Sequence, residues 1–245
     1  MTNHRLGRRR ALIAATACIG SALVTIAPSS IANALPTALV FTQYIEGSSN
    51  NKAIEISNLG PDPVDLSALS VDRYSNGGST PTAIALSGTL AAGESFVLAN
   101  SSANADILAV ADQTSGNANW NGDDGIVLRD GDGNIIDSFG RFEEDPGSQW
   151  VGIIDASVTT QNDTLCRNAD ITSGDTDFND VFDPSAEWFA KGEDSTEGLG
   201  NPTCDPQAVG DLIITQYIEG SSNNKAIEIA NFTGASLDLN DYDIE

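Results

Sequence analysis

Residues Thr42–Ile56 read TQYIEGSSNNKAIEI, and the same fifteen residues return at Thr215–Ile229. In each copy apolar and polar residues alternate on both sides of a GSSNN segment, which predicts a β-hairpin closed by a polar turn. An offset of 173 residues is too long for a solenoid repeat and indicates a duplicated domain. We therefore expect a first domain over residues 36–205 and the first strands of a second copy over 212–245.

The second copy has only 34 residues in this sequence, too few to bury a core of its own. We expect the chain to be an N-terminal piece of a longer protein. Asp, Ser, Gly and Pro dominate from Glu193 to Asp211, which predicts a linker that ends with residues 206–211.

Short strand patterns fill the first domain, and no helical period is evident. Strict alternation places Leu39, Phe41, Gln43 and Ile45 on one face of the first strand and Val40, Thr42, Tyr44 and Glu46 on the other. In the return strand Ile54 and Ile56 share a face. The sequence predicts an all-β sandwich or barrel. Further strand patterns lie around Val64–Val71, Ser95–Ala99, Gly125–Arg129 and Asn134–Asp137, with Trp150 and Trp188 as packing anchors.

The first 34 residues have the order of a secretory signal. Four arginines come first, an apolar run follows from Ala11 to Ala27, and Ala32-Asn33-Ala34 offers a cleavage site between Ala34 and Leu35. We expect export to the extracellular space or cell surface, with no membrane span in the mature form. Arg8–Arg10 matches a twin-arginine signal only loosely, and a lipoprotein cut at Cys18 is the other alternative.

The mature chain is strongly acidic. Cleavage removes four of the 11 basic residues and none of the 35 acidic ones, which leaves a net charge of −28. Such a surface repels phosphate backbones, so we expect no direct binding of nucleic acid. It favours solubility and is suited to divalent cations or high salt.

Two cysteines remain after cleavage, Cys166 and Cys204. In an exported protein an even pair predicts a disulfide, here one that ties the end of the first domain to its body. Two free thiols are the alternative.

Catalytic chemistry finds little support. The only histidine, His4, lies in the signal, which excludes Ser-His-Asp and Cys-His machinery and His-ligated zinc from the mature chain. Glu46 and Glu55 lie on adjacent predicted strands and offer a carboxylate pair of the glycosidase kind. Charges that point outward from a sandwich explain them better, so we expect no catalytic residue.

Two acidic segments have spacings that suit calcium, the only cofactor we consider. Asp130, Asp132 and Asn134 match the first three ligands of an EF-hand loop, but the glycine and glutamate of that loop are missing and a hairpin turn is favoured. The weak calcium candidates are Asp175, Asp177, Asn179, Asp180 and Asp183, for which a solvated loop is the alternative.

Trp120 lies between Asn119 and Asn121, an arrangement that suits stacking on a sugar or a base. Packing in the core or against a loop is favoured for this side chain.

Several blocks resemble the lamin tail domains of bacteria: QYIEGSSNNKAIEI, VDLSALSVDRYSNGG, LSGTLAAGESFVLAN, NWNGDDGIVLRDGDGNIIDSFG, TLCRN and FDPSAEW, which occur in the family's order from Leu39 to Gly200. The resemblance implies an immunoglobulin-like β-sandwich. This subtype resembles the modules found in front of secreted endonucleases of the endonuclease/exonuclease/phosphatase fold and of related surface hydrolases. The catalytic residues of those enzymes have no counterpart here.

The function expected from these observations is a non-catalytic, secreted accessory or binding module of a multidomain extracellular hydrolase such as a nuclease. The alternative is a structural or adhesive cell-surface protein built from tandem repeats. Its partner is expected to be a protein, a cell-wall component or another surface ligand. The duplicated hairpin also predicts dimers that exchange or pair strands.

Overall fold

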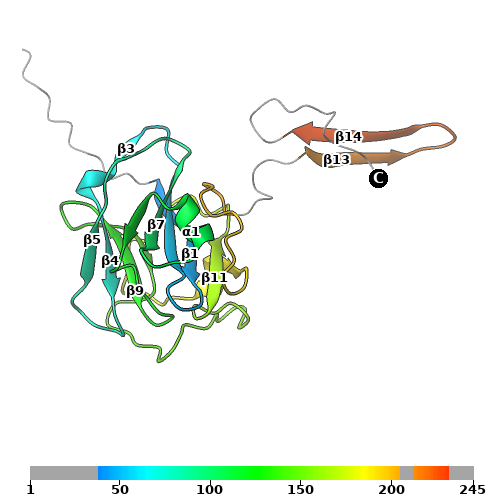
Figure 1. The fold of residues 1–245 in the computed structure, drawn as a ribbon. Coiled ribbons are helices and arrows are strands. Elements are labelled where there is room, and N and C mark those ends of the chain that lie inside the picture. The colour runs from blue at the N-terminus through cyan, green and yellow to red at the C-terminus, as the bar shows by residue number, and fades with distance from the viewer. Residues whose placement is uncertain (1–37, 205–211, 232–245) are drawn as a thin grey trace, which may run out of the picture. The chain divides into compact units, whose positions relative to one another are not determined.

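The structure is a computed structural model that describes residues 38–204 and 212–231 (Figure 1). Residues 38–204 form an all-β immunoglobulin-like sandwich, and residues 212–231 form a separate hairpin. The predicted signal, Cys18, the Ala34–Leu35 cleavage site, the linker at 206–211 and residues 232–245 lie outside the described residues.

One sheet of the sandwich has six strands in the order β12-β11-β1-β2-β7-β8. All its neighbours are antiparallel except β7 and β8, which are parallel. Its strands are β1 (Leu39–Glu46), β2 (Lys52–Asn58), β7 (Ser95–Asn100), β8 (Gln113–Ser115), β11 (Asp163–Arg167) and β12 (Trp188–Ala190).

The second sheet has four antiparallel strands in the order β10-β9-β4-β5. They are β4 (Ser70–Tyr74), β5 (Thr82–Ala85), β9 (Gly125–Arg129) and β10 (Ile135–Phe139). A short pair, β3 (Val64–Asp65) with β6 (Thr89–Leu90), lies between connections of the sandwich.

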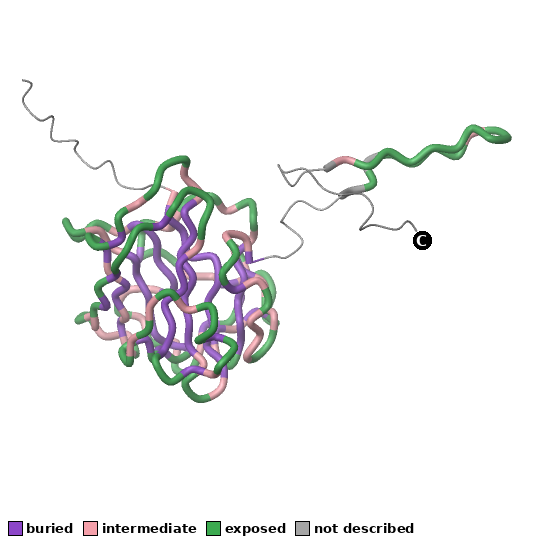
Figure 2. Tube along the Cα trace, turned by 45° about the horizontal axis from the view of Figure 1, so that its top comes forward, coloured by how far each residue is buried: buried purple, intermediate pink, exposed green. Residues whose placement is uncertain are grey.

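The main core lies between the two sheets, where Figure 2 shows the strands as a block of buried backbone. The six-stranded sheet contributes Phe41, Tyr44 and Ile54, and the four-stranded sheet contributes Ile126 and Phe139, all fully buried. Ile56 joins the same cluster, which confirms that Ile54 and Ile56 share a face. Trp150 and Trp188 are buried as predicted, at 5% and 3% exposure.

The predicted alternation of the first strand is wrong beyond Phe41. The register of β1 against β2 shifts between Phe41 and Gln43, as a β-bulge does. After the bulge Tyr44 faces the main core, whereas Ile45 belongs to a second apolar cluster on the outer face of the sheet. One extra residue therefore exchanges the faces of every later side chain in the strand.

That outer face is covered, which the sequence did not indicate. Val97 and Ala99 of β7 pack there with Ile45 and with Ile107 of helix α1 (Ala105–Val110). Leu199 joins them from the C-terminal segment of the domain, residues 193–204. The prediction that a linker begins at Glu193 is wrong for this reason, because residues 193–204 pack on the sheet as part of the domain.

Two short α-helices and a 3-10 turn interrupt the strands, although no helix was predicted. They are α1, α2 (Pro184–Glu187) and η1 (Leu66–Ala68). Each is at most six residues long, too short to show a helical period. Each begins at a side-chain cap, Asn104 for α1, Asp183 for α2 and Asp65 for η1. Within the described residues no helix has the length and hydropathy that a membrane crossing needs.

The second hairpin pairs β13 (Leu212–Glu219) with β14 (Lys225–Asn231). Its register reproduces that of β1 and β2, including the shift between Ile214 and Gln216. The repeated sequence thus forms the same local structure twice.

Candidate binding site at the end of the sandwich

The turn between β1 and β2 is closed by its own backbone. The Gly47 amide donates to the Asn51 carbonyl at 2.9 Å, and the Asn51 amide donates to the Ser48 carbonyl at 3.0 Å. A Cβ atom on Gly47 would lie 2.1 Å from Oδ1 of Asp194, so only glycine fits without displacement.

Asp194 fastens this turn to the C-terminal segment. Its carboxylate accepts hydrogen bonds from the Ser48 amide at 2.8 Å, the Ser48 hydroxyl at 2.5 Å and the Asn51 side-chain amide at 2.9 Å. Partial burial opposes ionisation of Asp194, but the bonds from Ser48 and Asn51 outweigh it and lower the pKa of the carboxyl.

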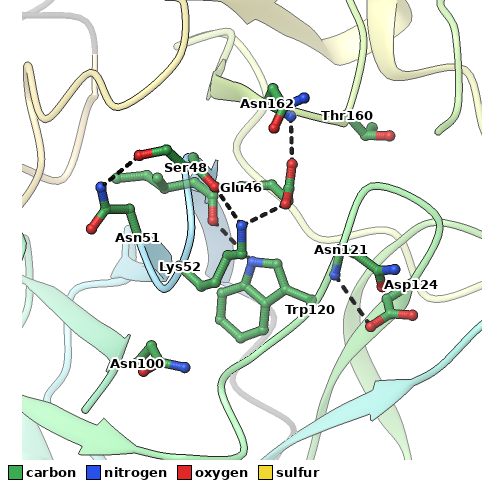
Figure 3. Close-up of polar contacts among 12 residues, drawn as sticks. Glu46, Ser48, Asn51, Lys52, Asn100, Trp120, Asn121, Asp124, Thr160 and Asn162 are labelled. Atoms are coloured by element: carbon green, nitrogen blue, oxygen red, sulfur yellow. Dashed lines mark hydrogen bonds and ion pairs between the residues drawn. The ribbon is translucent and has the colours of Figure 1, made fainter. Parts of the chain in front are cut away.

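Beneath the turn lies a buried ion pair. Nζ of Lys52 is 2.5 Å from Oε1 of Glu46, and both side chains are below 10% exposed. Lys52 also donates to the Gly47 carbonyl, and the second carboxylate oxygen of Glu46 accepts from the Asn162 amide. Figure 3 shows Asn162, Glu46 and Lys52 joined by these contacts. Each charge of the pair thus has a further hydrogen-bond partner. The bond between Glu46 and the Asn162 backbone amide anchors the turn to the loop before β11.

An open hollow of about 550 Å³ lies against this ion pair at the end of the sandwich. Amide side chains dominate its lining: Asn50, Asn76, Asn119, Asn121 and Asn162, all exposed. Trp120 also borders the hollow but is fully buried, and its Nε1 donates to the Ile45 carbonyl at 2.9 Å. The hollow therefore presents hydrogen-bonding groups and no exposed aromatic ring.

Arg73 also lines the hollow, and Asp123 and Asp124 both bind Asn76 next to it. Arg73 forms an ion pair with Asp124 at 3.1 Å, and Asp124 also accepts from the backbone amide of Asn76. Burial raises the pKa of Asp124, although these partners oppose the shift. Among the described residues Nε of Arg73 and Oδ1 of Asp123 have no hydrogen-bond partner.

The two glutamates considered as a catalytic pair do not come together. Glu46 points to the end of the main core, whereas Glu55 lies on the outer face, where it accepts from the Thr42 hydroxyl and the Gly200 amide at 2.5 Å each. The prediction that both point outward into solvent is wrong, because they are 5% and 0% exposed. The C-terminal segment covers Glu55, and the turn covers Glu46.

The five calcium candidates do not come together at one site. Asp175, Asp180 and Asp183 line a second hollow of about 400 Å³, in which Asp177 and Asn179 take no part. Asp175 and Asp177 each accept from the backbone amide two residues on, and Asp183 caps α2. Burial and the charges of Asp175 and Asp177 raise the pKa of Asp180. No group of three metal-ligating residues is found in the described part of the chain, and calcium binding stays a prediction.

Other predicted roles are confirmed. Asp130 closes the β9–β10 hairpin by accepting from the amides of Asp132 and Asn134 at 3.0 and 2.8 Å. Trp120 packs in the core beside Tyr44, so no face is free for a sugar or base. Cys166 and Cys204 form a disulfide with their Cα atoms 5.6 Å apart.

Sequence reasoning missed a buried charge cluster around Arg167 of β11. Its guanidinium lies 2.5 Å from Asp137 and 2.5 Å from Glu187, and it stacks over the Trp188 ring at 5.2 Å. Burial raises the pKa of Asp137 against the opposing effect of Arg167. Asp137 and Glu187 are 30 and 20 residues from Arg167 in sequence and form no motif with it, so the sequence held no signal for this cluster.

The sandwich geometry agrees with the comparison against known families. Residues 33–143 match the model of the Lamin Tail Domain family. This match supports a lamin-tail-domain protein, and the lamin tail domain is a non-catalytic immunoglobulin-like module. A search of curated proteins found no match.

Within the described residues the lamin tail domain match includes β1 through β10 and all the amides of the hollow except Asn162. It ends at Glu143, so β11, β12 and the disulfide lie beyond the matched range.

Proposed function

We propose that this chain is a non-catalytic binding module that is exported from the cell and positions an extracellular hydrolase such as a nuclease. The observation that supports this proposal is that the buried carboxylates bind groups of the domain itself. Glu46, Glu55 and Asp137 are each bound to backbone amides or cations of the domain itself. All three carboxylates are also buried, at 5% exposure or less, so they bind the fold itself and are not presented to a substrate.

Turnover by the purified chain tests the absence of catalysis. Protein with residues 1–34 removed is incubated with supercoiled plasmid and with Mg²⁺, Mn²⁺ or Ca²⁺ in separate reactions. We expect no nicking above buffer. Cleavage that co-purifies with the protein and disappears with its immunodepletion would contradict the proposal.

Export has its own test. The gene is expressed in a bacterial host, and the protein from the medium is analysed by intact mass. We expect a chain that begins at Leu35 and carries the Cys166–Cys204 disulfide, since disulfides persist outside the cytosol. A cytosolic product that keeps its first 34 residues would contradict export.

A structural or adhesive tandem-repeat protein is the second candidate. The observation in its favour is that β13 and β14 repeat both the sequence and the register of β1 and β2. The sequence of the gene downstream separates the two candidates: a domain rich in His, Asn and Asp clusters supports the first, and further copies of the hairpin support the second.

A further inference from the structure

The sequence identity between the two copies of the hairpin is complete over fifteen residues and then drops abruptly. All fifteen positions from Thr42 to Ile56 are identical to Thr215–Ile229, whereas only three of the sixteen positions that follow agree, Ser57–Asp72 against Ala230–Glu245. An overall constraint on the fold would spread the identity into the later strands, which pack in the same core. Something specific to this segment therefore limits its variation.

Most of the identical turn is explained by contacts inside the domain. Gly47 has no room for a Cβ, Ser48 and Asn51 bind Asp194, and Lys52 pairs with Glu46. Each of these side chains holds the turn to another part of the fold.

Ser49 and Asn50 are the exceptions. Both are exposed, and neither side chain forms a hydrogen bond within the described residues. Ser49 also adopts φ +56°, a left-handed conformation that glycine or asparagine would take more readily. The second copy keeps Ser222 and Asn223 at these places, with Ser222 again at φ +56°. Exposed turn residues with no internal partner usually vary freely, and strain at such positions points to function.

Both residues line the hollow at the end of the sandwich. The charged side chains of its lining are paired within the protein, Glu46 with Lys52 and Arg73 with Asp124. The hollow thus offers no free charge to an ion, and the net charge of −24 disfavours an anionic polymer.

Asn76 donates its side-chain amide to Asp123 at 3.0 Å. Within the described residues, the groups of the lining that remain free are the side-chain amides of Asn50, Asn119, Asn121 and Asn162 and the Ser49 hydroxyl. An asparagine side chain donates and accepts at once, as a sugar hydroxyl does, so a ring of amides is complementary to several neighbouring hydroxyl groups. Arg73, which also lines the hollow, has a buried Nε without a hydrogen-bond partner among the described residues, in a side chain 15% exposed. In the described part of the chain, the one aromatic residue in the lining of the hollow is Trp120, which is fully buried and presents no face to a base or an aromatic ligand.

We infer that this hollow binds an uncharged glycan chain, with Ser49 and Asn50 on one rim and Asn119 and Asn121 on the other. The inference rests on the proposed function and specifies its ligand class. It assigns the module a carbohydrate surface as its target.

The test is an NMR titration of ¹⁵N-labelled protein lacking residues 1–34. The probes are the tetramers of N-acetylglucosamine, glucose in β-1,4 and in α-1,4 linkage, and mannose. We expect saturable shifts for at least one tetramer, concentrated at Ser49, Asn50, Asn119 and Asn121. A twelve-nucleotide single-stranded DNA serves as the anionic control and is expected to cause none.

Two variants and a matched control locate the binding. Asn50→Asp and Asn119→Asp keep the side-chain shape but remove the amide donors, and each is expected to weaken binding about tenfold. Asn117→Asp introduces the same charge at an exposed position outside the hollow and is expected to leave the affinity unchanged. An unchanged melting temperature shows that each variant is folded.

The outcomes are distinct. Absence of saturable shifts with every tetramer up to about 10 mM, or binding that both variants leave intact, overturns the glycan inference. Mass spectrometry of the recovered tetramer distinguishes this from failure of the proposed function. An intact tetramer is compatible with a binding module, and a shortened one contradicts the absence of catalysis.

Discussion

At the scale of single residues, the domain uses buried charge to fix its geometry. Asp137 accepts from the Phe41 amide at 2.7 Å and from the Asp175 amide at 2.8 Å while it pairs with Arg167. One carboxylate thereby joins β1, β10, β11 and a loop. Glu55 on the outer face and Glu46 at the end of the core join separate segments in the same way, with other partners.

Glu55 is expected to make stability depend on pH. Burial raises its pKa from 4.5 to about 7, against the opposing bonds from Thr42 and Gly200. The folded state binds the proton more tightly than the unfolded state, so the free energy of unfolding falls as pH rises from about 4.5 to about 7, by about 3 kcal/mol.

Glu55→Gln removes this titration. Urea unfolding of the wild type and the variant from pH 4.5 to pH 8 is expected to show a flatter pH dependence for the variant. Parallel curves would mean that Glu55 ionises in the folded state as it does in water.

Arg167 is expected to be essential for stability. Arg167→Ala leaves Asp137 buried without its cation, which costs about 3–5 kcal/mol. Arg141→Ala is the matched control, because the Arg141–Glu144 pair is exposed and is worth at most about 1 kcal/mol. Chemical denaturation measures both, and equal losses would contradict the role assigned to the buried pair.

At the scale of elements, the C-terminal segment acts as a strap across the outer face of the six-stranded sheet. Asp194 fastens it to the β1–β2 turn, Leu199 packs in the outer cluster, Gly200 binds Glu55, and Cys204 closes it onto β11. Together with Ile107 of α1, the strap shields Ile45 and Val97 from water.

The disulfide at the end of the strap is expected to contribute about 4 kcal/mol on the chain-entropy model, since it closes a separation of 38 residues. Cys166→Ser with Cys204→Ser is expected to lower the free energy of unfolding by about that amount. Reduction of the wild type with dithiothreitol should give the same loss. A loss below about 1 kcal/mol would show that the other contacts of the strap suffice.

The strand patterns, the hairpin turns and the paired cysteines could be predicted from the sequence, because each depends on local chemistry or on composition. The bulge in β1 could not, since the apolar residues on either side fit an unbroken strand equally well. Apart from its disulfide, the strap could not either, because residues 193–204 are mostly polar and bind the sheet and its β1–β2 turn through Asp194, Leu199 and the Gly200 amide. The hollow combines asparagines from separate loops, which only the fold brings together.

At the scale of the whole molecule, the second hairpin exposes the apolar side chains that the first one buries. Tyr217 and Ile227 are 66% and 42% exposed, whereas their counterparts Tyr44 and Ile54 are fully buried. An apolar hairpin with unpaired edges favours pairing between chains.

We therefore predict that the chain forms dimers through residues 212–231. Sedimentation is expected to show dimers that disappear when residues 206–245 are deleted. Ile227→Lys in the full chain should also weaken them, because it places a charge in the apolar face. Dimers that survive the deletion would contradict this prediction.

Taken together, the buried carboxylates stabilise the fold by binding backbone amides outside the strands. Amide hydrogen exchange measured by NMR tests this role most directly. The amides of Asn162, Asp175 and Gly200 donate to Glu46, Asp137 and Glu55, whereas the Asp132 amide donates to Asp130 in an exposed turn.

We predict that the amides of Asn162, Asp175 and Gly200 exchange at least about 100-fold more slowly than the Asp132 amide, because they open only with larger units of the domain. Exchange of all four amides at the same fast rate would contradict the account.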